Sequence, residues 1–190
     1  MIDMIKALRG TKDILPDEIA LWQQIEAAGR DIFNIYGYKE IRTPIIEEAS
    51  LFIRSIGDAT DIVQKEMYVF SDRGGRNIAL RPEATASIAR SYIENSLFQP
   101  GGAAKLFYIG PMFRSERPQQ GRQRQFYQIG VEAIGSDSPF IDAEVIALAA
   151  RLLEHLGIKK FHIKLNSLGC QKDKIKVIEK HKENFRPHLG

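Results

Sequence analysis

The segment Gln125–Ile134 alternates between two kinds of side chain, which restricts it to a β-strand with unlike faces. Successive side chains of a strand point to opposite sides, so Tyr127, Ile129 and Val131 share one face and form a candidate core surface. The opposite face combines a cation, an aromatic ring, an amide, a glycine gap and a carboxylate, from Arg124, Phe126, Gln128, Gly130 and Glu132. Such a mixture is costly to bury unless a polar ligand satisfies it. The strand is therefore predicted to separate a core from a ligand surface.

The other elements favour an α+β fold, with an antiparallel β-sheet flanked by helices. Periodicity and end signals predict helices at about residues 16–36, 49–56, 85–96, 141–156 and 171–184. β-rich runs predict strands at residues 38–42, 67–70, 78–81, 105–114, 125–134 and 161–165. A break is expected at Gly110-Pro111, and Pro44 indicates an edge or interface position. Hairpin-like links without regular β-α-β alternation favour this class over a doubly wound sheet.

Length and charge indicate one main domain followed by a basic segment. The 190 residues are 44% hydrophobic, which is enough for a sizeable core. Residues 159–190 carry nine Lys or Arg against three acids, a charge of +6, so residues 1–158 carry −3 of the net +3. We expect a core at residues 1–158 and a basic strand-helix segment at residues 159–190 that starts a following region. The basic segment fits either a nucleic-acid contact or a solvated lysine-rich helix.

The chain is expected to be cytoplasmic, with no membrane contact and no metal centre. Its one cysteine, Cys170, cannot form an internal disulfide, and residues 1–30 lack the apolar run of a secretion signal. No apolar stretch approaches the ~20 residues of a membrane span. Metal-ligand spacing is absent among the four histidines, which are His155, His162, His181 and His188.

Arginines gather around the loop that precedes the alternating strand. Only Glu116 opposes the four of them, which are Arg114, Arg117, Arg122 and Arg124. Arg114, in the preceding strand, is expected to point to the polar face across the hairpin. Guanidinium groups bind phosphate oxygens with paired hydrogen bonds, so the spacing predicts a phosphate or nucleotide site.

Four segments, in order, carry a resemblance to a known family. The sequence Arg114-Ser-Glu116-Arg-Pro-Gln-Gln-Gly-Arg122-Gln-Arg-Gln-Phe126 resembles motif 2 of class II aminoacyl-tRNA synthetases in its histidyl-tRNA synthetase form. Residues 9–16 resemble the N-terminal signature of that family, residues 37–44 with the preceding helix resemble motif 1, and residues 80–85 resemble the amino-acid-binding loop. Residues 163–170 carry a weaker similarity.

The resemblance implies a catalytic domain, at residues 1–158, that uses ATP and Mg²⁺. Arg114 would be the catalytic residue, holding the ATP α-phosphate and the histidine carboxylate. Glu116 would contact the adenine amino group, Arg122 the outer phosphates, and Phe126 would stack on the adenine. Fixed arginines and Mg²⁺ would stabilise the charge that builds on the phosphoryl oxygens during attack.

The resemblance also implies a histidine pocket on the same face. Glu83, Thr85 and Gln128 would receive the α-amino group, Arg114 the carboxylate, and Glu132 one imidazole nitrogen. A buried carboxylate suits this task, because an apolar substrate of similar shape would leave it unpaired. Ala84 departs from the glycine that the family often has there, which would crowd the substrate loop.

The implied activity is that of a histidine–tRNA ligase, with L-histidine, ATP and tRNA(His) as substrates. Motif 1 implies a homodimer with Pro44 at the interface. The 190 residues match only the front of the catalytic domain, without motif 3, the second histidine-binding block and the anticodon-binding domain. We therefore expect weak or no activity from this chain alone.

Other interpretations stay open at this point. Glu83 or Thr85 would equally suit a cap for the helix after Pro82, and Pro44 a strand edge. The chain would also fit a histidyl-synthetase-like regulatory subunit of ATP phosphoribosyltransferase, although such a subunit has no need of the ATP loop. The third possibility is a non-catalytic RNA-binding module that uses the basic segment.

Overall fold

The computed structural model describes residues 5–57, 60, 62–116 and 121–166. The chain divides into two compact units, Met1–Ile158 and Lys159–Gly190. The first unit has helices α1 (Pro16–Ile35), α2 (Ala49–Ile56), α3 (Thr85–Glu94) and α4 (Pro139–His155), and a π-helical turn at Ile62–Glu66. Its strands are β1 (Lys39–Glu40), β2 (Ile46–Glu48), β3 (Tyr68–Ser71), β4 (Asn77–Leu80), β5 (Ala104–Phe113) and β6 (Gln125–Ile134).

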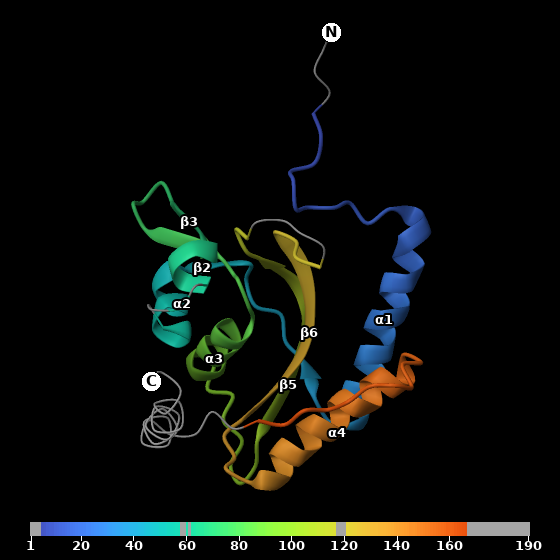
Figure 1. The fold of residues 1–190 in the computed structure, drawn as a ribbon. Coiled ribbons are helices and arrows are strands. Elements are labelled where there is room, and N and C mark those ends of the chain that lie inside the picture. The colour runs from blue at the N-terminus through green and yellow to red at the C-terminus, as the bar shows by residue number, and fades with distance from the viewer. Residues whose placement is uncertain (1–4, 58–59, 61, 117–120, 167–190) are drawn as a thin grey trace, which may run out of the picture. The chain divides into compact units, whose positions relative to one another are not determined.

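The longer sheet has the strand order β1-β5-β6. β5 and β6 form a long antiparallel ladder, from Ala104 opposite Ile134 to Phe113 opposite Gln125 (Figure 1). β1 pairs in parallel with β5, and this pair departs from the antiparallel pairing expected for the sheet. The chain passes through the second sheet, α2 and α3 between β1 and β5, which supplies the long crossover that a parallel pair needs.

The second sheet has the order β2-β4-β3 and is antiparallel throughout. β3 and β4 form the predicted hairpin, and their turn is held by the Asp72 carboxylate, which accepts hydrogen bonds from the N–H groups of Gly74 and Arg76. With helices around two mainly antiparallel sheets, the predicted α+β class is confirmed.

Helix α1 begins and ends where the sequence predicts. Pro16 occupies the first turn, where its fixed φ is suitable and no N–H is needed, and Asp17 and Glu18 lie near the positive end of the helix dipole. The helix ends before Gly37, which has a φ of +80° that residues with a side chain rarely adopt.

The β5–β6 ladder has a core on each side (Figure 1). On one side, α1 and α4 contribute to a cluster of Ile32, Phe33, Tyr38, Phe107 and Leu148, against which Ile129 and Val131 pack. The predicted core face of β6 is thereby confirmed. On the other side, residues of α3 and its N-terminal loop pack against the strands in a cluster of Ala84, Ile88 and Met112, joined by Tyr108 and Phe126.

Two expectations along the chain were wrong. β5 continues through Gly110 and Pro111 without a break. β1 pairs only with Leu106 and Phe107, so β5 has a single neighbouring strand at Pro111, where the missing N–H is tolerated. Residues 161–165 form no strand, since residues 159–166 contain no regular structure. The helix expected at residues 171–184 lies outside the described residues.

Candidate active site

Arg114 lies where β5 leaves the ladder and is fixed by three contacts. Its backbone N–H donates to the Arg124 carbonyl at 2.9 Å, which keeps the two residues opposite each other. The Arg114 Nε donates to the Pro82 carbonyl at 3.0 Å, and its guanidinium lies 5.1 Å from the centre of the Phe126 ring. Arg114 therefore projects from the polar face of the ladder, as the strand pattern predicts.

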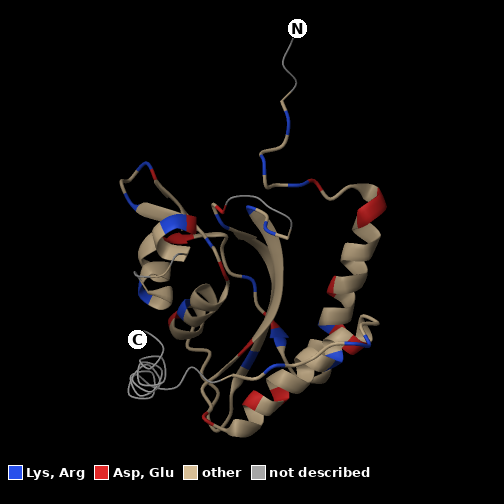
Figure 2. Ribbon diagram, in the orientation of Figure 1, with Lys and Arg blue, Asp and Glu red and all other residues tan. Residues whose placement is uncertain are grey.

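Glu116 contacts the neighbouring arginines through its side chain and its carbonyl. Its carboxylate lies 3.3 Å from Arg122 and 3.9 Å from Arg114, and its side chain is only 13% exposed. The Arg124 Nε donates to the Glu116 carbonyl at 3.3 Å. Basic segments consequently flank both sides of the turn between β5 and β6 (Figure 2). Three guanidinium groups around Glu116, with Glu66 as the second carboxylate nearby, leave an excess of positive charge that suits a polyanion.

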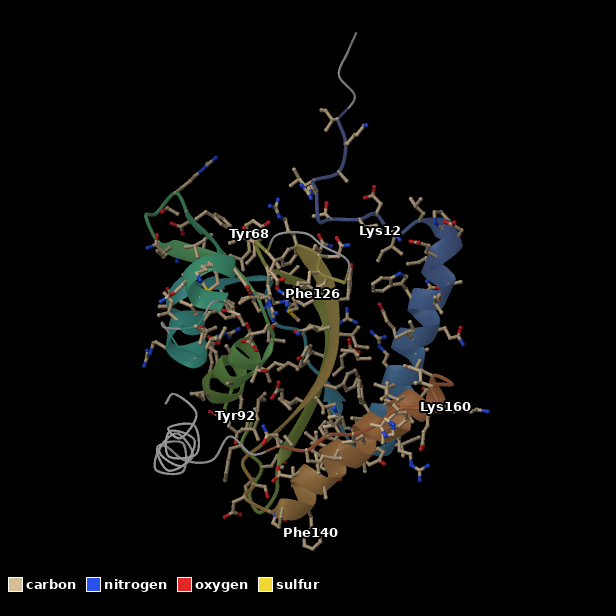
Figure 3. All side chains as sticks on the ribbon, viewed as in Figure 1. Lys12, Tyr68, Tyr92, Phe126, Phe140 and Lys160 are labelled. Atoms are coloured by element: carbon tan, nitrogen blue, oxygen red, sulfur yellow. The ribbon has the colours of Figure 1, made fainter. Side chains whose placement is uncertain are left out.

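A cavity of about 560 Å³ opens beside this cluster. All four residues expected to bind ATP line it, namely Arg114, Glu116, Arg122 and Phe126. Phe126 lies near the centre of the molecule on the side of β6 that faces α2 and α3 (Figure 3). Glu66 also lines the cavity and was not predicted. Its carbonyl accepts a hydrogen bond from Ser115 N–H at 2.6 Å, a contact between distant segments that no local sequence signal indicates.

The N-terminal signature reaches the same end of the ladder. The Gly10 carbonyl accepts hydrogen bonds from the N–H groups of Arg124, at 2.6 Å, and Gln125, at 3.2 Å. These contacts hold the start of β6, where the arginine-bearing loop between β5 and β6 ends. The segment therefore supports the arginine cluster through its backbone, a role that the sequence analysis did not assign.

A second polar cluster lies farther along the same face. The Thr85 hydroxyl donates to the Glu132 carboxylate at 2.7 Å and so joins α3 to β6. Glu83 accepts hydrogen bonds from the N–H groups of Thr85, at 2.6 Å, and Ala86, at 2.9 Å. Glu83 thus caps α3, which confirms the structural interpretation left open for it, whereas Thr85 makes no capping bond. The structure therefore brings Glu83, Thr85 and Glu132 together, as predicted.

The surroundings of Glu132 disfavour its charge. Burial raises the pKa of the Glu132 carboxyl, the Thr85 hydrogen bond opposes this, and the neighbouring Glu83 carboxylate raises the pKa further. An ionised Glu132 is thus poorly solvated in the ligand-free chain. A cationic or N–H-donating ligand would relieve this cost.

Tyr108 lies near Glu83 and Glu132, which with Thr85 form the acidic cluster, and it was missed by the sequence analysis. Burial, followed by the Glu132 and Glu83 carboxylates, raises its pKa to about 12, so the phenol is neutral at physiological pH. Tyr108 lies opposite Gly130 in the ladder, and a Cβ at Gly130 would lie 2.6 Å from the Tyr108 hydroxyl. The Tyr108 ring of β5 therefore fills the gap that Gly130 leaves on this face. The position of Tyr108 becomes apparent only from the register of the ladder.

Gln128 lies between the two clusters, opposite Gly110. Its Oε1 is buried and accepts no hydrogen bond from any residue that the structure describes. A buried amide oxygen without a donor is costly, so the position is suited to a ligand N–H group. Gln128 thus lies on the polar face, and its contact with the α-amino group stays a prediction.

Pro44 lies apart from both clusters, in the exposed segment between β1 and β2. The neighbouring Ile45 and Ile46 are 41% and 49% exposed. Exposed apolar side chains beside a proline are compatible with the interface predicted there. Within the described part of the chain, no group of three or more acidic, histidine or cysteine side chains is arranged to hold a metal ion. No helix there is long and apolar enough to cross a bilayer.

Comparison with known proteins places the chain in a family. The family profile described as histidyl-tRNA synthetase matches residues 10–183. A histidine–tRNA ligase of Acaryochloris marina is 57% identical over 175 residues, which cover 92% of this chain and 41% of the relative. That of Geobacillus sp. is 60% identical over 162 residues, which cover 85% of this chain and 38% of the relative.

Solved structures agree with this placement. The apo histidyl-tRNA synthetase of S. aureus is 45% identical, with a TM-score of 0.69 over 82% of this chain and 41% of that protein. A Bacillus halodurans protein described as an ATP phosphoribosyltransferase regulatory subunit/histidyl-tRNA synthetase is 28% identical, with a TM-score of 0.70 over 83% of this chain and 39% of its own. The chain thus spans about two fifths of the length of these relatives, and it belongs to the histidyl-tRNA synthetase family.

Proposed function

We propose that the chain forms part of the catalytic domain of a histidine–tRNA ligase, which activates histidine with ATP and transfers it to tRNA(His). The observation that carries this proposal is the position of Arg114. It lines the arginine-rich cavity, and its Nε is bound to the carbonyl of Pro82, the residue before Glu83 in the acidic cluster. These two contacts support a role for this one guanidinium at both candidate substrate sites.

In the proposed reaction, the histidine carboxylate attacks the α-phosphate of ATP and pyrophosphate leaves. The two anions repel each other, and negative charge builds on the phosphoryl oxygens. Arg114 would hold both groups, and its fixed Nε limits the reorganisation required. Arg122 would bind the outer phosphates, Phe126 would stack on adenine, and Glu116 would accept the adenine amino N–H.

Magnesium would enter with the triphosphate. The described residues contain no three-ligand cluster, so they do not form a dedicated protein cage for the ion. Mg²⁺ usually keeps several waters and is shared between one or two carboxylates and substrate phosphates, and Glu66 and Glu116 are the carboxylates that line the cavity. When bound, the ion would neutralise charge on the phosphates.

The acidic cluster would select histidine. Gln128 Oε1 has a free acceptor position for the α-ammonium, and Glu83 and Thr85 lie beside Glu132. Glu83 can still accept further hydrogen bonds, because a carboxylate has about four acceptor positions and the two N–H groups of the α3 cap use only two. Glu132 would accept the imidazole N–H, which would offset the cost of its own burial.

The remaining features of the proposal concern the whole protein. Residues 1–158 would be the catalytic core with motifs 1 and 2, and residues 159–190 the start of the following region. The protein would act in the cytoplasm as a homodimer, with Pro44 at the subunit contact. Because the chain spans about 41% of its relatives, its activity alone is expected to be weak or absent.

Histidine-dependent exchange of pyrophosphate into ATP tests the proposal. We expect slow exchange that requires histidine rather than the other amino acids and that disappears in Arg114→Ala. If exchange is below detection, a non-hydrolysable histidyl-adenylate analogue should still bind the wild-type chain. Exchange that is indifferent to the amino acid, or neither exchange nor analogue binding, would contradict the proposal.

A regulatory subunit of ATP phosphoribosyltransferase is the second candidate, favoured by the likeness to the Bacillus halodurans protein. The two candidates differ at the arginine cluster, since a regulatory subunit does not need to bind ATP for adenylation. Histidine binding without any ATP binding would favour the regulatory function. ATP binding that depends on Arg114 would favour the ligase.

A further inference from the structure

Arg81 is a buried cation without an acidic partner among the described residues. The residue is only 7% exposed, yet its guanidinium contacts oxygens of the backbone and of one threonine. Its Nε donates to the Pro111 carbonyl at 3.0 Å, and one terminal nitrogen donates to the carbonyl and hydroxyl of Thr43, at 3.0 and 3.2 Å. Burial lowers the pKa of this guanidinium, and the more distant charges of Tyr108 and Glu47 oppose this only in part. Such a group is costly for stability alone.

The backbone around Arg81 ties the same segments together. Arg81 N–H donates to the Ile45 carbonyl at 2.9 Å, and the Arg81 carbonyl accepts from Phe113 N–H at 3.0 Å. The next carbonyl, that of Pro82, accepts from the Arg114 Nε at 3.0 Å. Arg81 and Pro82 therefore join the segment that bears Pro44 to the end of β5 and to Arg114.

β5 leaves room for this guanidinium at Gly110. A Cβ built at Gly110 would lie 2.7 Å from a terminal nitrogen of Arg81. The φ of Gly110 is not in the left-handed region, so its glycine is required for space and not for backbone conformation. Even the smallest side chain at this position would displace Arg81 without changing its charge.

We propose that Arg81 is a positioning residue that couples the Thr43–Pro44 segment to Arg114. The proposal rests on the proposed function, in which Arg114 holds the reacting phosphate, but its structural part concerns the ligand-free chain. The contacts form one route: Thr43 to the Arg81 guanidinium, Arg81 to Pro82 along the chain, and Pro82 to the Arg114 Nε. A change at the exposed Pro44 segment would thus reach the phosphate-binding guanidinium.

Two variants separate positioning from a merely structural role. Arg81→Lys keeps the charge, but a single ammonium cannot reproduce the planar fork that spans Thr43 and Pro111. Gly110→Ala keeps Arg81 and displaces it. Gly102→Ala is the matched control, because a Cβ there meets nothing within 4 Å and its φ is ordinary. All three are first compared with wild type by circular dichroism and thermal melting.

The primary readout is solvent exchange of the Arg114 Nε–H in ¹⁵N NMR spectra of the full chain, assigned by its loss in Arg114→Lys. We expect exchange at least ten times faster in Arg81→Lys and Gly110→Ala, with Gly102→Ala within a factor of two of wild type. ATP affinity by calorimetry should fall at least tenfold in the same two variants.

The outcomes distinguish this inference from the proposed function. Folded variants with unchanged Nε–H exchange would overturn the positioning role, and so would loss of folding in both variants, since Arg81 would then serve the fold as a whole. Failure of the wild-type chain to bind ATP would count against the proposed function instead. The exchange measurement would still decide the role of Arg81.

Discussion

The two ends of the polar face of the β5–β6 ladder carry opposite charge. At the turn end, Arg114 and Arg122 share the single carboxylate of Glu116. At the other end, Glu83 accepts hydrogen bonds from two N–H groups and Glu132 accepts one from the Thr85 hydroxyl, and neither forms an ion pair with a described Lys or Arg. One ladder therefore presents a basic cluster and an acidic cluster in sequence, which supports the proposed sites for a phosphate and an amino group.

The largest expected effect is the loss of ATP affinity when Arg114, at the turn end of the ladder, is removed. Arg114→Ala takes away the guanidinium that lines the cavity and lies over Phe126, so we expect ATP affinity to fall by roughly a hundredfold or more, as for charge-assisted contacts in general. Calorimetry with ATP measures it. Arg73→Ala, in the exposed turn of the β3–β4 hairpin, is the control. A loss below about threefold would remove Arg114 from the ATP site.

A smaller and selective effect is expected at the acidic end. Glu132→Gln keeps the shape and an acceptor for the Thr85 hydroxyl but removes the charge, so histidine affinity should fall about tenfold while ATP affinity stays within a factor of two. Separate titrations with each substrate give the two numbers, and Glu154→Gln, exposed on α4, serves as the matched change. Equal losses for both substrates would show that the two ends are not functionally distinct.

The smallest expected effect is a pH dependence of the free energy of unfolding that arises from Glu132, at the acidic end of the ladder. Burial raises the pKa of Glu132 above its ordinary value, so the folded state holds this proton more tightly than the unfolded state. The free energy of unfolding should therefore fall as pH rises from the ordinary pKa to the raised one, and then level off. Histidine affinity should change in the opposite direction, because ligand binding needs the ionised form.

Melting temperatures of wild type and Glu132→Gln across this range measure the effect. The variant should be relatively more stable at neutral pH, and its advantage should vanish as pH falls toward the ordinary carboxyl pKa. The expected difference is small, since Glu132 is only partly buried. A constant difference between the two proteins at all pH values would contradict the raised pKa.

Local periodicity was sufficient to predict much of the fold. The ten residues of β6, the α1 boundaries and the β3–β4 hairpin follow from alternation, helix-end residues and turn composition. The parallel pairing of β1 with β5 did not follow, because it joins segments more than sixty residues apart. The strand expected at residues 161–165 had the right alternation, but alternation alone does not supply a partner strand.

The candidate site was predictable where it lies on one strand or carries a motif. Arg114, Phe126 and Glu132 share a face because the strand period requires it. Tyr108 and Arg81 were missed because each side chain fills the space beside a glycine of a different segment. Tyr108 lies against Gly130 of β6, and Arg81 lies against Gly110 of β5. Such space is a property of the register and not of the local sequence.

Binding of a non-hydrolysable histidyl-adenylate analogue tests most directly whether the two ends form one site. The analogue places an adenylate at the arginine end and a histidine at the acidic end at the same time. The account predicts that the wild-type chain binds it at least tenfold more tightly than ATP or histidine alone, and that Arg114→Ala and Glu132→Gln each reduce this affinity. An affinity no better than that of ATP alone, unaffected by Glu132→Gln, would contradict the account.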